Sequence, residues 1–337
     1  MANIINQTIL RGGVNPCISA IRLIAMSLII ACHILQYYDN KLAWQLNIGV
    51  QIFFILSGFL YGNKEIDDPI RWIRKNLYKI ILPYWIFLVI VIVSYLLFAP
   101  EYINLNSCIS ALLGISTIKG VEHLWFVGYI IVGYLITPYL HIIARSLNTN
   151  NTLSKNVLIL ICTITIYYII QVMTNAYFNP DKISCYILGY YSAIFIKLYK
   201  LEYKKVALGM ILLSLIMICI RFICAYCDCI EPILYSQLVK ISYIIIAFAI
   251  TFSLMIILKK IRYNKLLLFS DKYSYTIYLV HQLFILSPFT LLRATDYMTI
   301  NVIIVVAVTI ASSCLLKFLS NTTDAFISRY FTRQTNS

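Results

Sequence analysis

Residues 80–99 read IILPYWIFLVIVIVSYLLFA, a run of twenty positions without a charged side chain. The hydrocarbon core of a bilayer is about 30 Å thick and a helix rises 1.5 Å per residue, so roughly twenty apolar residues cross it. The run is apolar on every face, whereas a strand of a membrane barrel alternates apolar and polar residues. The stretch therefore predicts a transmembrane helix.

The rest of the chain repeats this pattern. Of its 337 residues, 61% are hydrophobic and 12% are charged, and the mean hydropathy of +0.84 lies far outside the range of soluble domains. No Gly/Ser-rich or Pro-rich linker divides the chain, so we expect a single domain over residues 1–337. The fold class that follows is an all-α polytopic membrane bundle of about ten transmembrane helices, with spans expected at Pro16 to Gln36, Asn47 to Gly62, Ile80 to Ala99, His123 to Ile143, Val157 to Tyr177, Ile183 to Ile196, Val206 to Ala225, Gln237 to Leu258, Ser274 to Leu292 and Ile300 to Leu316.

The basic residues between the spans predict the orientation. With the N-terminus inside, the inner segments hold twenty Lys and Arg residues, and the outer segments hold four, which are Lys41, Lys119, Lys182 and Arg293. Positive residues stay on the cytoplasmic side, so we expect both termini in the cytoplasm and the protein in the cytoplasmic (inner) membrane. The net charge of +14 then reflects topology and contact with anionic membrane lipids, and nucleic acid is not an expected partner.

Arg22 and His33 are the most informative polar residues of the first span. Arg at the centre of a span costs about 2.5–3.5 kcal/mol and calls for a partner or a purpose. The two residues are eleven positions apart, so both side chains lie on one helix face, roughly 16 Å apart along the axis. A structural alternative is that Arg22 reaches the inner surface and that His33 merely ends the helix near the outer surface.

Five blocks of sequence resemble the acyltransferase 3 family of integral membrane O-acyltransferases. Arg22 and His33 reproduce the family's spacing of Arg, ten residues and His. The remaining blocks follow in the family's order and are Phe53 to Leu60 (FFILSGFL), Arg71-x-x-Arg74 leading to Lys79 and Pro83-Tyr84-Trp85, His123-Leu124-Trp125-Phe126 with Pro138, and Ser274 to His281 (SYTIYLVH). Lys79 departs from the pattern, because many members carry Arg there.

The resemblance implies transfer of an acyl group, commonly acetyl from coenzyme A, to a hydroxyl of a polysaccharide or glycolipid. His33 is then the candidate catalytic base, because a neutral imidazole can take the proton of a hydroxyl that attacks a thioester. An acyl-histidine intermediate on His33 is also compatible with the sequence. Arg22 is the second candidate catalytic residue and would orient the acyl donor through its fixed charge.

The same resemblance suggests residues for the donor and for support of the site. Arg71, Arg74 and Lys79 would bind the phosphates of acetyl-CoA or another acyl-CoA, although the positive-inside rule alone also explains their charge. The residues expected to contact substrate or to support the site are His123, Trp125, Tyr278 and His281. We expect His281 near the middle of the ninth span, either in a functional role or as a neutral ring bonded to a backbone carbonyl or a Tyr.

Other features of the sequence bear on a metal site, a nucleophile and a transport function. No two of the four histidines have i, i+4 spacing, and Cys224, Cys227 and Cys229 have no accompanying histidine, so we predict no metal. No Gly-x-Ser-x-Gly pattern surrounds Ser57-Gly58, which therefore indicates close helix packing rather than a nucleophile. A transporter or flippase of a lipid-linked sugar is the alternative function, although no inverted repeat supports it. The outer segment Pro100 to Glu122 either lies along the interface or re-enters the membrane.

Overall fold

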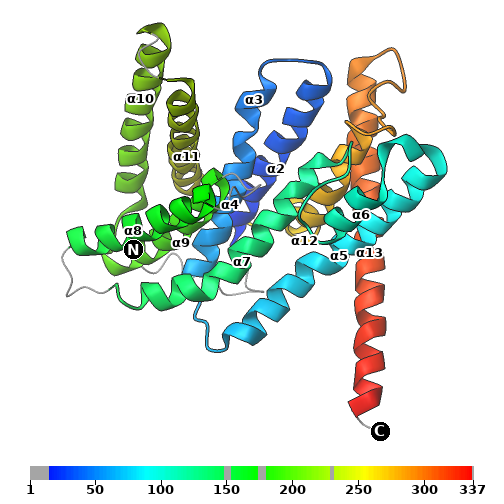
Figure 1. Ribbon diagram of the computed structural model, residues 1–337, viewed down its shortest axis with the longest axis horizontal. Helices are drawn as coiled ribbons and strands as arrows, with labels where there is room; N and C mark the ends of the chain where they lie inside the picture. The colour runs from blue at the N-terminus through cyan, green and yellow to red at the C-terminus, as the bar shows by residue number, and fades with distance from the viewer. Residues whose placement is uncertain (1–14, 148–152, 174–179, 228–230, 336–337) are drawn as a thin grey trace. The chain divides into compact units, whose positions relative to one another are not determined.

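A computed structural model describes residues 15–147, 153–173, 180–227 and 231–335 (Figure 1). Within these ranges the chain is helical apart from turns and contains no strand, which confirms the predicted all-α class. Seven helices of the described chain are long and apolar enough to cross a membrane. The chain is an integral membrane protein.

Each predicted span overlaps a helix. The helices concerned are α2 (Pro16–Tyr37), α4 (Ile48–Gly62), α5 (Pro69–Phe98), α7 (Trp125–Ala144), α8 (Leu153–Met173), α9 (Pro180–Leu198), α10 (Tyr203–Cys227), α11 (Pro232–Ile257), α12 (Lys265–Val280) and α13 (Met298–Thr335). The short helices α3 (Ala43–Leu46) and α6 (Leu105–Leu112) and three 3-10 turns complete the described chain. Helices α9 and α12 are not among these seven, and within α8 the apolar stretch found in the described residues is the shorter Lys155–Ile166. The predicted number of about ten is therefore only roughly supported.

The described residues pack as two compact units. The first unit takes its residues from Met1–Ile29, Leu46–Asp67 and Leu135–Leu268, and the second unit from Ile30–Gln45, Asp68–Tyr134 and Phe269–Ser337. The chain passes between the units several times, and α2 belongs to the first unit as far as Ile29 and to the second unit from Ile30. A single domain over the whole chain stays a prediction.

Helices α4 and α9 meet backbone to backbone in the first unit. A Cβ atom built on Gly58 would lie 2.0 Å from the carbonyl oxygen of Tyr186, and one built on Gly189 would lie 2.2 Å from that of Ile55. Small residues permit such close approach of membrane helices. Gly58 thus serves close helix packing, as the sequence indicated.

Helix α5 and the segment that follows it belong to the second unit. The Tyr84 hydroxyl donates to the carbonyl of Ala111 at 2.5 Å, and the Trp85 indole nitrogen donates to that of Leu112 at 3.0 Å. Tyr84 lies fourteen residues before Phe98, the end of α5, which corresponds to about 21 Å along the helix. Helix α6 therefore folds back along α5 to the middle of that helix.

The ninth predicted span was wrong in its second half. Helix α12 ends at Val280, and His281–Phe284 form a 3-10 turn instead of continuing the helix to Leu292. Pro288 cannot donate to a helical ladder, and the Ser287 hydroxyl bonds the carbonyl of Leu283, so local bonds compete with the helix. The turn and the loop after it are held by an apolar cluster of Ile34, Ile285, Leu292 and Val305.

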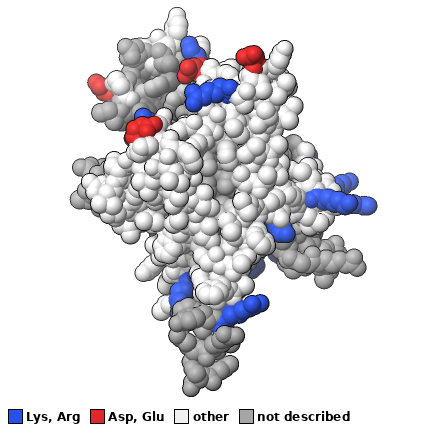
Figure 2. Space-filling view, turned by 90° about the vertical axis from the view of Figure 1, so that its right-hand side faces the viewer, with Lys and Arg blue, Asp and Glu red and all other residues white. Residues whose placement is uncertain are grey.

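Figure 2 shows one face of the molecule in space-filling form. A broad expanse of this face carries no charged side chain, and the Lys, Arg, Asp and Glu residues lie at its margins. An uncharged surface of this kind suits contact with lipid, where an unpaired charge is costly.

Candidate active site

Three histidines that lie far apart in the sequence converge in the second unit. His33 comes from α2, His123 from the 3-10 turn Glu122–Leu124, and His281 from the turn after α12. The ring centroids of His123 and His281 are 4.7 Å apart, those of His33 and His281 are 5.3 Å apart, and those of His33 and His123 are 6.4 Å apart. His123 and His281 are buried and His33 is half-buried. We call these three residues the histidine cluster.

Each ring of the histidine cluster is held through one nitrogen. Nδ1 of His281 lies 2.6 Å from the carbonyl oxygen of Tyr278, Nε2 of His123 lies 3.0 Å from that of Leu279, and Nδ1 of His33 lies 3.1 Å from Oε1 of Gln36. An oxygen of this kind only accepts, so the nitrogen facing it carries the hydrogen of a neutral ring.

The opposite nitrogen of each ring then has a free lone pair. These atoms are Nε2 of His33, Nδ1 of His123 and Nε2 of His281. Among the described residues, Nδ1 of His123 and Nε2 of His281 have no hydrogen-bond partner although both are buried. Buried polar atoms in native structures are nearly always bonded, so unpaired ones mark a place where a ligand can bind. The histidine cluster can accept protons or hydrogen bonds from such a ligand.

A second set of hydrogen bonds fixes His123. Its backbone N–H donates to Oε1 of Gln282 at 2.8 Å, and the Tyr278 hydroxyl donates to its carbonyl oxygen. Gln282 in turn donates to Oε2 of Glu122 at 3.2 Å, and Oε1 of Glu122 accepts from the backbone of Gly120 at 2.9 Å. One amide side chain therefore joins the turn that carries His123 to the turn that carries His281.

Replacing Gln282 with leucine should test this link. The substitution keeps the approximate volume but leaves the buried N–H of His123 without its acceptor, which costs about 1–3 kcal/mol. We expect a lower midpoint of thermal unfolding in detergent micelles. Glu122→Gln keeps an acceptor for the N–H of Gly120 and leaves the bond from His123 to Gln282 in place, so it should lose less. Equal losses in the two variants would argue against the link.

The other residues predicted for the site are placed as follows. The Tyr278 ring lies 5.2 Å from that of His123, so it joins the cluster, whereas the Trp125 ring contacts Phe126 and Tyr129. His281 does not lie in the middle of a helical span, as the sequence predicted, but at the first position of the turn after α12. Arg22 belongs to the first unit, so its part in the reaction stays a prediction.

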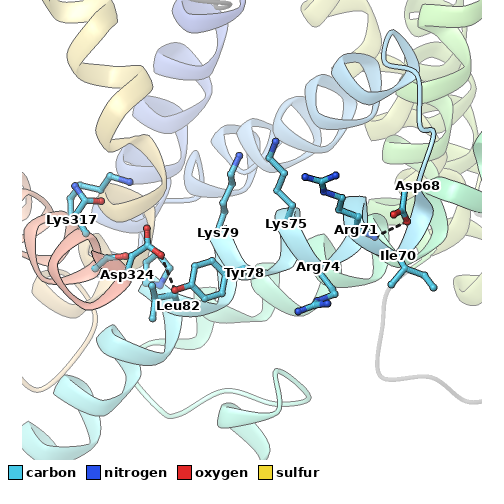
Figure 3. Close-up of a pocket in the computed structure, with 13 residues that line it drawn as sticks. Asp68, Ile70, Arg71, Arg74, Lys75, Tyr78, Lys79, Leu82, Lys317 and Asp324 are labelled. Atoms are coloured by element: carbon cyan, nitrogen blue, oxygen red, sulfur yellow. Dashed lines mark hydrogen bonds between the residues drawn. The ribbon is translucent and has the colours of Figure 1, made fainter. Parts of the chain in front are cut away.

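A polar groove of about 940 Å³ lies between α5 and α13, both in the second unit (Figure 3). Arg71, Arg74 and Lys79, the residues predicted to bind the donor, all line it. Figure 3 shows that Arg71 and Lys79 point to the same side of α5 as Lys75, whereas Arg74 points to the opposite side. The Tyr78 hydroxyl donates to Oδ1 of Asp324 at 2.9 Å and joins α5 to α13 across the groove.

Helix α12 runs from a contact with α5, one wall of the groove, to the histidine cluster. The Tyr275 hydroxyl donates to the carbonyl oxygen of Ile80, the residue after Lys79, at 2.9 Å. Tyr278, one turn further along, contacts His123, and His281 is the first residue after the helix. The six residues from Tyr275 to His281 correspond to about 9 Å along the helix. The hydrogen bond of Tyr275 therefore places Ile80 of α5 against the helix that leads to His281 of the histidine cluster.

Sequence reasoning missed several residues of the site. Gln36 holds His33 and lies three positions further along α2, a spacing that places both on one helix face. Gln282 follows His281 directly, but the spacing of a continuous helix would have pointed it away from His123. Lys317, Asn321 and Asp324 line the groove from α13 at i, i+4 and i+7 spacing, which is one face of a helix.

Within the described ranges, no group of three His, Cys, Asp or Glu side chains is arranged to hold a metal ion. Of the predicted cysteine run, Cys229 lies outside the described residues. Cys224 and Cys227, which precede it in α10, form no disulfide.

Comparison with known proteins identifies the family. The model of the acyltransferase 3 family, described as an acyltransferase domain, matches residues 15–318. The chain belongs to the acyltransferase 3 family. The match includes every residue of the histidine cluster and of the α5 wall of the groove, and it confirms the resemblance found in the sequence. Membership in the acyltransferase 3 family makes the protein an acyltransferase that uses an acyl donor and an acceptor. No curated protein and no solved structure matches the chain.

Proposed function

We propose that the protein transfers an acetyl group from acetyl-CoA to a hydroxyl of a polysaccharide or glycolipid of the cell envelope. The observation that carries the proposal is the histidine cluster, in which each ring is held through one nitrogen and leaves the other nitrogen free to act as a base. The cation-lined groove supplies a place for the phosphates of the donor. One of its walls, α5, is bonded at Ile80 to Tyr275 of α12, the helix that leads to His281.

His33 performs the proton transfer in this proposal. The acceptor hydroxyl attacks the thioester carbonyl while Nε2 of His33 takes its proton, and the bond from carbon to sulfur then breaks. The leaving thiolate of coenzyme A takes a proton and departs as the thiol, which returns His33 to its neutral form. His33 is the most exposed of the three rings, so the acceptor reaches it more easily than the buried His123 and His281.

Arg22 and the basic residues act on the donor in the proposal. Arg71 and Lys79 bind its phosphates in the groove, and Arg74 contributes positive charge from the other side of α5. Arg22 orients the donor. Both termini and the groove face the cytoplasm of an inner membrane, which is where coenzyme A is made available, and the acceptor meets the acetyl group on the side of His33.

A reconstituted system tests the function directly. The purified protein in lipid vesicles receives acetyl-CoA labelled in the acetyl group together with candidate glycans, and we expect label on the glycan. Movement of a lipid-linked sugar across the vesicle membrane without labelling would instead favour the transporter. Label that stays on the protein after treatment with acetyl-CoA alone would assign the acyl-histidine route.

A further inference from the structure

The cation-lined groove has a second wall that the family resemblance does not describe. Helix α13 supplies Lys317, Ser320, Asn321 and Asp324, and the hydrogen bond from Tyr78 to Asp324 holds this helix against α5. In Figure 3 Lys317 lies across from Lys79 and extends toward it. Lys317 is nineteen residues from Met298, the start of α13, or about 28 Å along the axis, which is the thickness of a hydrocarbon core.

On the facing wall, Arg71, Lys75 and Lys79 form a stripe along α5. Their i, i+4 and i+8 spacing places the three cations one turn apart and extends over about 12 Å. Like charges at i, i+4 destabilise a helix. The salt bridges of the described residues involve other cations. The two carboxylates that also line the groove accept hydrogen bonds elsewhere, Asp68 from the backbone N–H of Arg71 and Asp324 from the Tyr78 hydroxyl. With Arg74 included, five cations from two helices line the groove against two carboxylates, and this excess of positive charge favours a ligand that carries several phosphates.

The two ends of the groove differ, and this difference predicts which phosphate binds at each end. The end at Lys79 is next to Ile80, whose carbonyl accepts from Tyr275 of α12, the helix that leads to the histidine cluster. The end at Arg71 lies two turns of α5 away from Lys79. In acyl-CoA the pyrophosphate lies between the acyl-bearing arm and the ribose that carries the 3′-phosphate. The arm, when extended, is comparable to four or five residues of extended chain, roughly 15 Å, which exceeds the rise of about 9 Å from Tyr275 to His281.

We propose that Lys317 and Lys79 bind the pyrophosphate of the acyl donor from opposite walls, and that Arg71 at the far end of the stripe binds its 3′-phosphate. This inference rests on the proposed function and adds to it a residue of α13 and the direction in which the donor lies. The Tyr78 to Asp324 hydrogen bond positions Lys317 by holding the two walls together. The chemistry that the site recognises is a phosphate group, which an anionic lipid headgroup also provides.

Binding of two nucleotides by the full chain tests the proposal. The protein in nanodiscs of phosphatidylcholine is titrated with coenzyme A and with dephospho-coenzyme A, which lacks only the 3′-phosphate. Lys317→Gln should raise the Kd of both nucleotides about tenfold, because both contain the pyrophosphate. Arg71→Gln should raise the Kd of coenzyme A about tenfold and leave that of dephospho-coenzyme A unchanged.

Arg329→Gln is the matched control. Arg329 lies on α13 as Lys317 does, is exposed and does not line the groove, so its removal takes one positive charge from the same helix without touching the site. Its Kd for both nucleotides should equal that of the wild type. An equal loss in Arg329→Gln and Lys317→Gln would overturn the proposal, since it would show a general effect of charge.

Two further results would also overturn it. The first is a Lys317→Gln variant with wild-type Kd for both nucleotides. The second is Lys317-dependent binding to phosphatidylglycerol vesicles with nucleotide binding unaffected, which would assign the groove to a lipid headgroup. If the wild type labels a glycan, either result leaves the proposed function intact. A wild type that binds coenzyme A but never labels a glycan contradicts the proposed function and not this binding site.

Discussion

Replacing His33 with alanine is expected to lower kcat by about 10²–10⁴-fold, the usual contribution of a general base. The free lone pair on Nε2 of His33 is the atom that would take the proton, and alanine removes it. The KM for acetyl-CoA should change little, because the groove that binds the phosphates is formed by α5 and α13. The measurement is the initial rate of glycan labelling in vesicles as a function of acetyl-CoA concentration.

His141→Ala provides the control for this experiment. His141 lies in the first unit, where its Nδ1 is 3.3 Å from the Tyr190 hydroxyl, and it is not part of the histidine cluster. This variant should keep a kcat close to that of the wild type. If His33→Ala retained the wild-type kcat while His281→Ala lost it, the base would be His281, and our assignment of the proton transfer would be wrong.

Added imidazole separates catalysis from positioning. A small base that enters the space left by the His33 ring can take the proton in its place, so millimolar imidazole should restore part of the kcat of His33→Ala. It should not restore a variant in which the fold around the cluster is damaged, such as Gln282→Leu.

Much of the architecture could be predicted because lipid leaves the chain few choices. A backbone in hydrocarbon must satisfy its own hydrogen bonds, so an uncharged run such as residues 80–99 forms a helix whatever its neighbours are. Spans that carry charge near one end are harder, and α12, with Lys265, Asp271 and Lys272, begins well before its predicted start. The loss of helix after Val280 depends on Ser287 and Pro288, whose side chains act locally and do not change the hydropathy.

The sequence could predict individual residues of the site but not that they lie close together. The sequence indicated His33, His123 and His281 separately, since an ionisable group near the membrane core calls for a function. Their convergence depends on three elements that are up to 248 residues apart, and no spacing within one helix encodes it. The sequence did not indicate Lys317, because the positive-inside rule already explains a basic residue at the inner end of a span. Its position across from Lys79 follows only from the packing of α13 against α5.

Replacing Gly58 with alanine is expected to destabilise the protein by about 3 kcal/mol, at the upper end of the usual cost of overpacking. The added methyl group would stand 2.0 Å from the carbonyl oxygen of Tyr186, and that atom belongs to the backbone of α9. A flexible side chain could turn away, but a helix backbone can only move as a whole. Gly189→Ala meets the backbone of Ile55 from the opposite side and should cost a similar amount.

Gly209→Ala is the control that distinguishes a packing clash from the effect of replacing any helical glycine on stability. Gly209 lies in α10, and a Cβ atom there would have no heavy atom within 4 Å, so alanine should stabilise the protein by about 0.5–1 kcal/mol through its better helix propensity. Thermal unfolding of the three variants in the same detergent then gives opposite signs for Gly209 and the other two. A Gly58→Ala protein as stable as Gly209→Ala would mean that α4 and α9 do not touch through their backbones. The close packing that holds the FFILSGFL block against α9 would then have to come from side chains instead.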